Sequence, residues 1–287
     1  MLAEFPAAEF NDSGGGLAGD ELISFLAGVP GAVISLEPVD SDFLARLPEL
    51  RMISKYGVGL DNLDLTAMEE AGVTLGWSGG LNRRGVAEMT LSFMIGLNRN
   101  LYGSSLDLRR GAWLKDGGRD LSSCTVGIIG VGFVGKEVAM LLEPLGCQIL
   151  VNDIIDQAEY YQAHGLKEAS KEDIYTGADV ITVHTPLTDL TRGMVDAAVL
   201  DGMKPDAYLI NAARGGIVNQ EDLKQALIEG RIAGAALDVF ELEPCPDQEL
   251  LGLANLWPTP HIGGSSAQSM LAMGRSSIYH LCKFFKG

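Results

Sequence analysis

TVGIIGVGFVGKEVAMLLEPLGCQILVND, residues 125–153, is the stretch that decides the fold. Its first and last parts are apolar runs, and between them lies a helix-period stretch with apolar Val134, Val138 and Leu142. Short apolar runs on either side of such a stretch are typical of a βαβ unit with parallel strands. We therefore expect strands at 125–130 and 148–153, joined by a helix that ends near Gly146.

Three glycines of this stretch, Gly130, Gly132 and Gly135, have the spacing GxGxxG between the first strand and the helix. The first permits a tight turn, the second lets the backbone approach a pyrophosphate at the helix N-terminus, and the third lets helix and strand pack. Asp153 ends the next strand, where a carboxylate accepts hydrogen bonds from the adenosine ribose. The glycines alone would also fit a purely structural turn. With strand, helix and acid together, the motif predicts a dinucleotide site, and NAD is preferred to NADP because no Arg or Lys follows in DIIDQ.

The rest of the chain continues the alternation of short strands and helices. Further strands are expected at 180–184, 208–213 and 234–239, and a helix at 219–230 with Asn219 as its N-cap. This pattern predicts an α/β protein whose Rossmann-type, doubly wound parallel sheet spans residues 101–265. Residues 1–100 form a smaller, flavodoxin-like α/β substrate domain, completed by a C-terminal helix at 266–287. The polar, glycine-punctuated segment 102–123 is expected to cross between the two domains.

Composition and charge disfavour several classes of protein. The 287 residues carry 21 Lys and Arg against 38 Asp and Glu, a net charge of −17, which argues against nucleic acid and anionic membranes as partners. The four cysteines lie apart without metal-ligand spacing, so we expect reduced thiols, no metal and a cytoplasmic protein. The first residues have no basic segment followed by an apolar one, so no signal peptide is expected.

Five further segments occur in a specific order: KYGVGLDNLD (55–64), HTPLTDLT (184–191), INAARGGIV (210–218), ALDVFELEP (236–244) and TPHIGGSS (259–266). With the glycine motif, they closely resemble the D-2-hydroxyacid dehydrogenase family, in particular its phosphoglycerate-dehydrogenase-like branch. The likeness runs from about Ala32 to near the C-terminus. It implies an enzyme that transfers hydride between NAD(H) and a small D-2-hydroxy acid or 2-oxo acid.

The resemblance assigns three catalytic residues. His261 matches the general base or acid that exchanges a proton with the substrate hydroxyl. Glu243 matches the carboxylate that holds this histidine and stabilises its imidazolium form, and Arg214 matches the arginine that binds the substrate carboxylate and polarises the C2 oxygen. Considered alone, such an arginine or histidine is more often structural. His164, His184 and His280 are expected to be structural or surface residues, with His184 at most near the cofactor.

The same resemblance assigns contacts to the cofactor. Asp238 matches an acid that orients the nicotinamide carboxamide, although it can also be read as a cap at the end of a strand. Backbone or side-chain contacts to the cofactor are implied for Phe133, Val134, Thr185, Ala212, Gly263 and Gly264, in addition to the glycine motif and Asp153.

The substrate contacts are less determined by the sequence. Val58 and Gly59 match amides that bind the carboxylate, and Asn82 and Glu88 match residues that support the substrate loop. The cations Lys55, Arg83 and Arg84 stand in segments that the family places around the substrate. They either capture a second anionic group, such as the phosphate of 3-phosphoglycerate, or form ordinary surface salt bridges.

Two departures from the family pattern bear on this interpretation. The strand GAVISLEP lacks the arginine that some phosphoglycerate dehydrogenases have near this place, and no regulatory domain is expected after Gly287. A βα unit that usually opens the first domain is either missing or replaced by MLAEFPAAEFNDSGGG. We expect either that the sheet of that domain lacks its first strand or that the start is that of a shortened gene model.

Two other functions fit the same scaffold. One is an NAD(H)-sensing binding protein without significant turnover, and the other is a formate- or phosphite-type dehydrogenase, which the segments HIGGSS and Glu243 disfavour. The family also implies a homodimer, in which the apolar residues of segment 101–122 either form an arm to the partner or pack within the chain.

Overall fold

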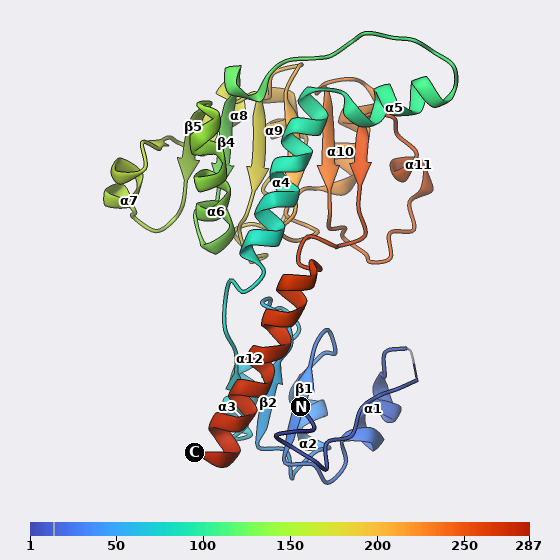
Figure 1. Cartoon of the computed structure of the whole chain (residues 1–287), viewed down its shortest axis with the longest axis vertical. Helices are drawn as coiled ribbons and strands as arrows, with labels where there is room; N and C mark the ends of the chain where they lie inside the picture. The colour runs from blue at the N-terminus through green and yellow to red at the C-terminus, as the bar shows by residue number, and fades with distance from the viewer. Residues whose placement is uncertain (14) are drawn as a thin grey trace. The chain divides into compact units, whose positions relative to one another are not determined.

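The computed structural model describes residues 1–13 and 15–287. The chain divides into two compact units, one formed by Met1–Asn82 with Ala267–Gly287 and the other by Arg83–Ser266. Each contains a parallel sheet with helices, so the predicted α/β class is confirmed (Figure 1). No helix in the described part of the chain is long and apolar enough to cross a membrane.

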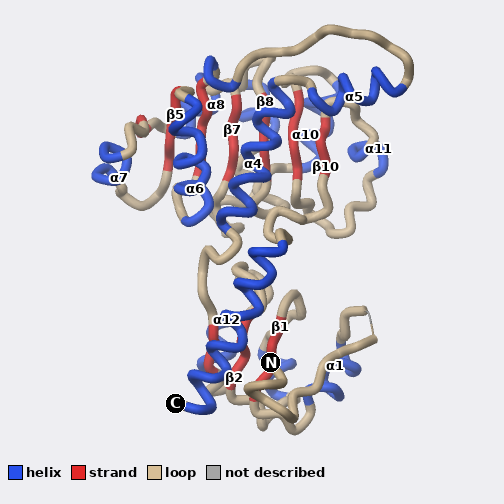
Figure 2. The backbone as a smooth tube through the Cα atoms, in the orientation of Figure 1, coloured by secondary structure: helices blue, strands red, loops and turns tan. Residues whose placement is uncertain are grey.

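The second unit is built on a seven-stranded sheet in the order β10-β9-β8-β7-β4-β5-β6, with every neighbouring pair parallel (Figure 2). Its strands are β4 (Thr125–Ile129), β5 (Gln148–Asn152), β6 (Lys167–Glu168), β7 (Val180–Val183), β8 (Tyr208–Asn211), β9 (Gly234–Leu237) and β10 (Leu256–Pro258). The five strands expected from the sequence are all present, while the short β6 and β10 were not expected.

Helices cover both faces of this sheet (Figure 1). The front face of Figure 1 is covered by α4 (Arg83–Asn98) and α6 (Phe133–Leu142), and the back face by α8 (Lys171–Gly177), α9 (Ala197–Gly202) and α10 (Gln220–Ile228). Shorter or peripheral elements are α5 (Leu101–Arg109), η1 (Leu121–Ser123), η2 (Glu143–Leu145), α7 (Ala158–Ala163) and α11 (Gln248–Leu251).

The central strand β4 shows how the sequence produces these layers. Val126 and Ile128 are buried with Phe93 and Met94 of α4, whereas Ile129 is buried with residues of α8, α9 and α10. Successive side chains of a strand point to opposite faces, so a strand that is apolar at nearly every position must be covered on both sides.

The start of helix α10 follows from local chemistry. The Asn219 side chain accepts a hydrogen bond from Asp222 N and thereby caps α10 as predicted.

The order of the strands determines where a ligand can bind in this unit. The chain proceeds from β4 outward to β5 and β6, then returns to pair β7 with the other side of β4 and continues to β8, β9 and β10. In open parallel sheets, ligands bind at the carboxyl ends of the strands where the direction of winding reverses. The loops after β4 and β7 therefore lie at the expected site.

The first unit has a three-stranded parallel sheet in the order β1-β2-β3, formed by Gly31–Ile34, Met52–Lys55 and Thr74–Gly76. Helices α1 (Gly19–Leu26), α2 (Ser41–Ala45) and α3 (Leu65–Glu70) share a core with Ile53 of β2. The next residue, Ser54, donates a hydrogen bond to the Ser277 carbonyl of α12 (Ala267–Lys286), which packs against β2 and β3. The described residues before α1 form turns and bends without a strand.

Segment 102–123 does not cross between the units, so this prediction is wrong. The chain passes from one unit to the other after Asn82, and both ends of the segment are held by the second unit. Arg119 Nε donates to Asn98 Oδ1 over 2.9 Å, and the Tyr102 ring packs edge-on against Trp257 with centroids 5.6 Å apart. The physical reason is α4, whose apolar side chains complete the core of the second unit instead of that of the first. The assignment of substrate and cofactor roles to the two domains stays a prediction.

Candidate active site

The glycine loop after β4 is built so that only glycine fits at two of its three positions. A Cβ atom on Gly135 would lie 2.0 Å from the Gly130 carbonyl oxygen, and one on Gly130 would lie 2.7 Å from the His184 carbonyl. Gly130 also has φ of +92°, a conformation that other residues rarely adopt. A Cβ on Gly132 would meet nothing within 4 Å, so this position borders open space at the N-terminus of α6.

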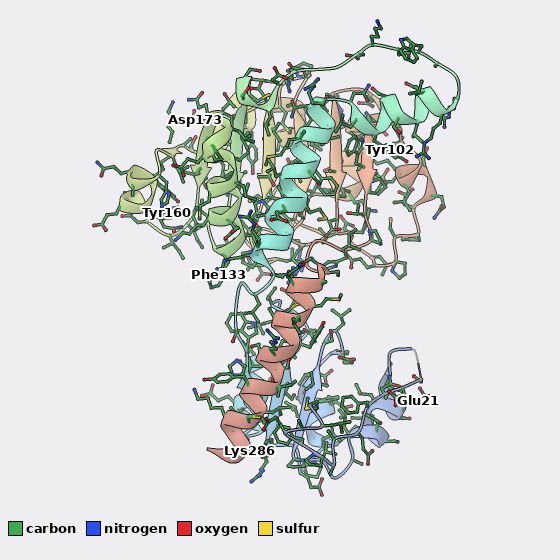
Figure 3. All side chains as sticks on the ribbon, in the orientation of Figure 1. Glu21, Tyr102, Phe133, Tyr160, Asp173 and Lys286 are labelled. Atoms are coloured by element: carbon green, nitrogen blue, oxygen red, sulfur yellow. The ribbon has the colours of Figure 1, made fainter. Side chains whose placement is uncertain are left out.

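This geometry fits a dinucleotide pyrophosphate. The first amides of α6 have no partner within the helix, and a phosphate can approach them closely where Gly132 has no side chain. Phe133, labelled at the start of α6 in Figure 3, is 59% exposed, while Val134 is half-buried. The loop therefore provides the backbone donors and the space that NAD requires.

Asp153 follows β5, as predicted, and its carboxylate also organises the glycine loop. One oxygen accepts from Val131 N over 2.6 Å and the other from Ile155 N over 2.9 Å. Gln157, which sequence reasoning did not identify, donates from its side chain to the Val131 carbonyl. An Asp or Glu is the expected partner of ribose hydroxyls at this place. Within the described residues these backbone contacts leave further lone pairs on its oxygens for them.

The loop after β7 adds two polar atoms to the same edge of the sheet. The Thr185 Oγ1 and His184 Nδ1 atoms are buried and have no hydrogen-bond partner among the described residues. Burial lowers the pKa of His184 from 6.5 to about 4, so its ring is neutral near pH 7. Unpaired buried polar atoms are uncommon in folded proteins. Here they belong to two residues whose other atoms, the His184 carbonyl and Thr185 Cγ2, lie against the first glycine of the loop.

The loop after β8 carries Arg214 and Ala212. Asn211, which is 1% exposed, brackets this loop: its side-chain oxygen accepts from Ala213 N over 3.1 Å and its amide donates to the Arg214 carbonyl over 2.9 Å. A Cβ on Gly215 would lie 1.8 Å from the Phe240 carbonyl oxygen, so the Arg214 loop packs directly on the loop that follows β9. Arg214 Nη1 donates to the Ala213 carbonyl.

The loops after β9 and β10 bring Glu243 and His261 together. Glu243 Oε2 lies 2.8 Å from His261 Nδ1, and the other oxygen accepts from Phe240 N over 3.0 Å. The imidazole is therefore oriented through Nδ1, which leaves Nε2 for chemistry. His261 has φ of +54°, and its backbone N donates to the Asp238 carbonyl over 2.8 Å.

Asp238 is 1% exposed, and its carboxylate holds the loop that carries His261. Its Oδ1 accepts from the Thr259 hydroxyl over 2.6 Å and from Ile262 N over 2.8 Å, and its Oδ2 accepts from Gly263 N over 2.8 Å. Three donors from one loop make Asp238 an anchor for the backbone on both sides of His261. The predicted contact of Asp238 with the nicotinamide stays a proposal, as do the contacts of Gly263 and Gly264.

Four of the predicted substrate residues, Lys55, Val58, Gly59 and Asn82, belong to the first unit. Lys55 is 4% exposed, and its ammonium group donates to the Ser35 carbonyl and to Asn62 Oδ1. Its charge is therefore used to hold the loop that contains Val58 and Gly59, a role that the sequence did not reveal. Asn82 has a buried Oδ1 atom without a partner in the described part of the chain.

Arg83 and Arg84 begin α4 in the second unit and share a carboxylate with α6. Arg83 Nε lies 3.3 Å and Arg84 Nη1 3.2 Å from the two oxygens of Glu137, and Arg84 Nε lies 2.6 Å from Glu88. These ion pairs match one of the two alternatives expected for Arg83 and Arg84, that they form ordinary surface salt bridges. They also gather two cations at the helix end that follows Asn82.

Comparison with known proteins identifies the family. The model of the D-isomer specific 2-hydroxyacid dehydrogenase, NAD binding domain, matches residues 91–263, which include the glycine motif, Asp153, Arg214, Glu243 and His261. D-3-phosphoglycerate dehydrogenase of Mycobacterium tuberculosis is 34% identical over 257 residues, which are 88% of this chain and 49% of that protein. The chain thus spans about half the length of the curated phosphoglycerate dehydrogenases that it matches.

A second relative matches over most of its length. (S)-Sulfolactate dehydrogenase of Chromohalobacter salexigens is 35% identical over 253 residues, which are 86% of this chain and 82% of that protein. Among solved structures, D-lactate dehydrogenase of Aquifex aeolicus, complexed with NAD and lactic acid, has a TM-score of 0.88 at 24% identity. The superposition includes 100% of this chain and 91% of the lactate dehydrogenase chain. At that identity the likeness concerns the fold. The chain has an NAD-binding domain and belongs to the D-isomer specific 2-hydroxyacid dehydrogenase family.

Proposed function

We propose that this protein is an NAD-dependent oxidoreductase that transfers hydride between NAD(H) and a small D-2-hydroxy acid or its 2-oxo acid. The observation that carries the proposal is the His261–Glu243 hydrogen bond of 2.8 Å, at the carboxyl edge of the sheet that also carries the glycine loop and Arg214. A histidine whose Nδ1 is held by a carboxylate is suited to proton transfer through Nε2. An NAD(H) sensor without turnover does not need this pair.

Arg214, Glu243 and His261, here called the trio, have distinct tasks in this proposal. At the glycine loop and Asp153, bound NAD would supply the hydride acceptor for oxidation at C2, and bound NADH the hydride donor for the reverse reduction. His261 Nε2 takes the hydroxyl proton as the C2–O bond becomes a carbonyl, and Glu243 stabilises the resulting imidazolium. Arg214 binds the substrate carboxylate and polarises the C2 oxygen through its guanidinium group. In the reverse direction, His261 donates the proton to the oxygen.

We further propose a substrate with a second anionic group, of which 3-phosphoglycerate is the leading candidate. Two relatives are named for such acids, since phosphoglycerate carries a phosphate and sulfolactate a sulfonate beside the carboxylate. Arg83 and Arg84 supply paired cations for that group, although Glu137 shares them in this structure. In the first unit, Lys55 holds the loop of Val58 and Gly59, and the family resemblance supports these two amides as ligands of a carboxylate.

The test is the change in NADH absorbance with matched pairs of acids. Glycerate and hydroxypyruvate are compared with their 3-phospho counterparts, and lactate and pyruvate with sulfolactate and sulfopyruvate, with Arg83→Gln/Arg84→Gln as the variant. We expect kcat/KM for the doubly anionic acids to exceed that for the singly anionic ones by about tenfold or more, and the variant to remove the difference. Equal rates for both groups would contradict the substrate class. Tight NADH binding without turnover of any acid would contradict the enzymatic function and favour the sensor.

We also propose that the protein is a homodimer that uses residues 101–115 as an arm. Helix α5 buries no residue within the chain, and Trp113 and Leu114 beyond it are 75% and 66% exposed. Adjacent exposed apolar side chains of this size are typical of a surface covered by a partner.

A further inference from the structure

His184 presents a buried polar atom that the proposed reaction does not use. Its Nδ1 atom has no hydrogen-bond partner among the described residues, whereas its Nε2 atom lies 2.9 Å from the Thr182 hydroxyl. A buried ring nitrogen without a partner is unfavourable unless a ligand supplies one. The question is whether this atom donates or accepts a hydrogen bond.

The neighbouring threonine determines the answer. Thr182 is fully buried in β7, and in the described structure the hydrogen bond of its hydroxyl is to His184. If Nε2 carried the proton, the Thr182 hydroxyl would accept it and its own proton would have no acceptor. If Thr182 instead donates to Nε2, the hydroxyl proton has an acceptor and the Nε2 lone pair has a donor. The pairing therefore favours the tautomer in which Nδ1 carries the proton, so His184 has an unused N–H donor.

The position of His184 indicates what this donor meets. Its backbone N donates to the Ile129 carbonyl over 2.7 Å, and a Cβ atom on Gly130 would lie 2.7 Å from the His184 carbonyl carbon and oxygen. His184 thus lies against the first glycine of the loop that fits the pyrophosphate. Thr185, the next residue, has the other unpaired buried polar atom at this edge, its Oγ1.

We propose that His184 is a neutral donor that binds an oxygen of the bound dinucleotide, either of the pyrophosphate or of the ribose on its nicotinamide side, through Nδ1–H, and that Thr182 positions it by fixing the tautomer. The lowered pKa of His184 agrees with this role, because the ring stays neutral down to about pH 4 and its N–H remains available on one nitrogen. The inference rests on the proposed dinucleotide site and concerns binding instead of turnover.

The test uses calorimetric affinities of the purified protein for NADH, ADP-ribose, ADP and AMP. His184→Leu removes the donor, and His184→Asn is the matched control because its amide places an N–H near the position of Nδ1. We expect His184→Leu to weaken NADH and ADP-ribose binding by roughly tenfold, and His184→Asn to stay within about threefold of the wild type. An equal loss for ADP assigns the contact to the pyrophosphate, and an unchanged ADP affinity assigns it to the ribose on the nicotinamide side. AMP, which lacks both the diphosphate linkage and that ribose, serves as the control and stays unchanged.

Two outcomes would overturn the proposal. One is a folded His184→Leu protein that binds NADH within about twofold of the wild type. The other comes from the wild-type protein itself, in which nitrogen-detected NMR of the histidines reports the tautomer. We expect a proton on Nδ1 and a shift of its resonance when NADH is added, so a proton on Nε2, or a resonance that NADH leaves unchanged, would contradict the assignment even if no variant folds. Neither measurement depends on turnover, so a failure here is distinguishable from a failure of the proposed reaction.

Discussion

Asn211 holds the loop of Arg214, the arginine of the proposed reaction, through backbone atoms. It is 1% exposed and holds the backbone of the next turn at Ala213 N and at the Arg214 carbonyl. The guanidinium group of Arg214 can bind a planar carboxylate with two hydrogen bonds only if its backbone is placed accurately. In the proposed reaction, Asn211 therefore acts through the position of Arg214 and not through a contact with the substrate.

Replacement of Asn211 by Ala should affect the substrate more than the cofactor. We expect kcat/KM for the 2-oxo acid to fall by roughly tenfold to a hundredfold, mainly through KM, because Arg214 loses its fixed position. Steady-state kinetics and NADH affinity check this, and Asn211→Asp is the control that keeps the acceptor for Ala213 N. If KM stays unchanged in Asn211→Ala, the bracket does not position Arg214.

The sequence motifs singled out Arg214, Glu243 and His261, whose catalytic roles stay a proposal, but not the residues that hold the loops around them. Arg214, Glu243 and His261 were identified because they stand in ordered motifs that resemble a family. Asn211, Thr182 and Gln157 act through backbone atoms or neighbours that only the folded chain brings close. Lys55 shows the same limit, because the sequence reveals its charge but not the Ser35 and Asn62 oxygens around it.

At the scale of elements, local patterns predicted β4, α6 and β5 because each is encoded within its own residues. The boundary between the two units was not predictable in this way. Helix α4 has the same apolar period whichever core it joins, and only the packing of Phe93 and Met94 against α6 and the sheet assigns it to the second unit. Strands β6 and β10 have two and three residues, which is too few for a periodic pattern to appear.

The glycine loop permits a matched pair of substitutions at this scale. In Gly135→Ala, the new Cβ atom would lie 2.0 Å from a backbone oxygen, so α6 must move away from β4. We expect a loss of about 1–3 kcal/mol of unfolding free energy together with weaker NADH binding.

Gly132→Ala is the control, because its Cβ meets nothing within 4 Å. We expect unchanged stability and weaker NADH binding, since the methyl group enters the space of the pyrophosphate. Chemical denaturation and NADH titration distinguish the two effects. A Gly132→Ala protein with wild-type NADH affinity would show that the pyrophosphate does not lie at this loop.

At the scale of the whole molecule, His184 makes stability depend on pH. Its pKa is lowered from 6.5 to about 4 in the folded chain, so below pH 6.5 the unfolded chain binds a proton that the folded chain does not. The stability that this group contributes is complete above pH 6.5, falls as the pH drops, and is lost by about pH 4.

We therefore expect the difference in unfolding free energy between wild type and His184→Asn to shift in favour of the variant between pH 6.5 and pH 4. Urea denaturation of both proteins at several pH values measures this difference, and carboxylates that titrate in both proteins cancel. Parallel pH profiles would show that the His184 ring is not shielded from water in solution.

The arm at 101–115 predicts the assembly state. Trp113→Lys/Leu114→Lys should convert the proposed dimer to monomers, because two charges would replace side chains that are 75% and 66% exposed in the single chain. Sedimentation velocity of wild type and variant checks this result. A monomeric wild-type protein, or a variant dimer of unchanged stability, would assign another role to these residues.

The central claim is that His261, oriented by Glu243, transfers the proton that accompanies hydride transfer. The most direct test is single-turnover oxidation of NADH by a 2-oxo acid, with wild type compared to His261→Asn after the NADH affinity of each has been measured. We predict that the variant binds NADH within about threefold of the wild type and loses a factor of roughly a hundred to ten thousand in the rate. A variant that binds NADH normally and retains a rate within about tenfold of the wild type would contradict the account.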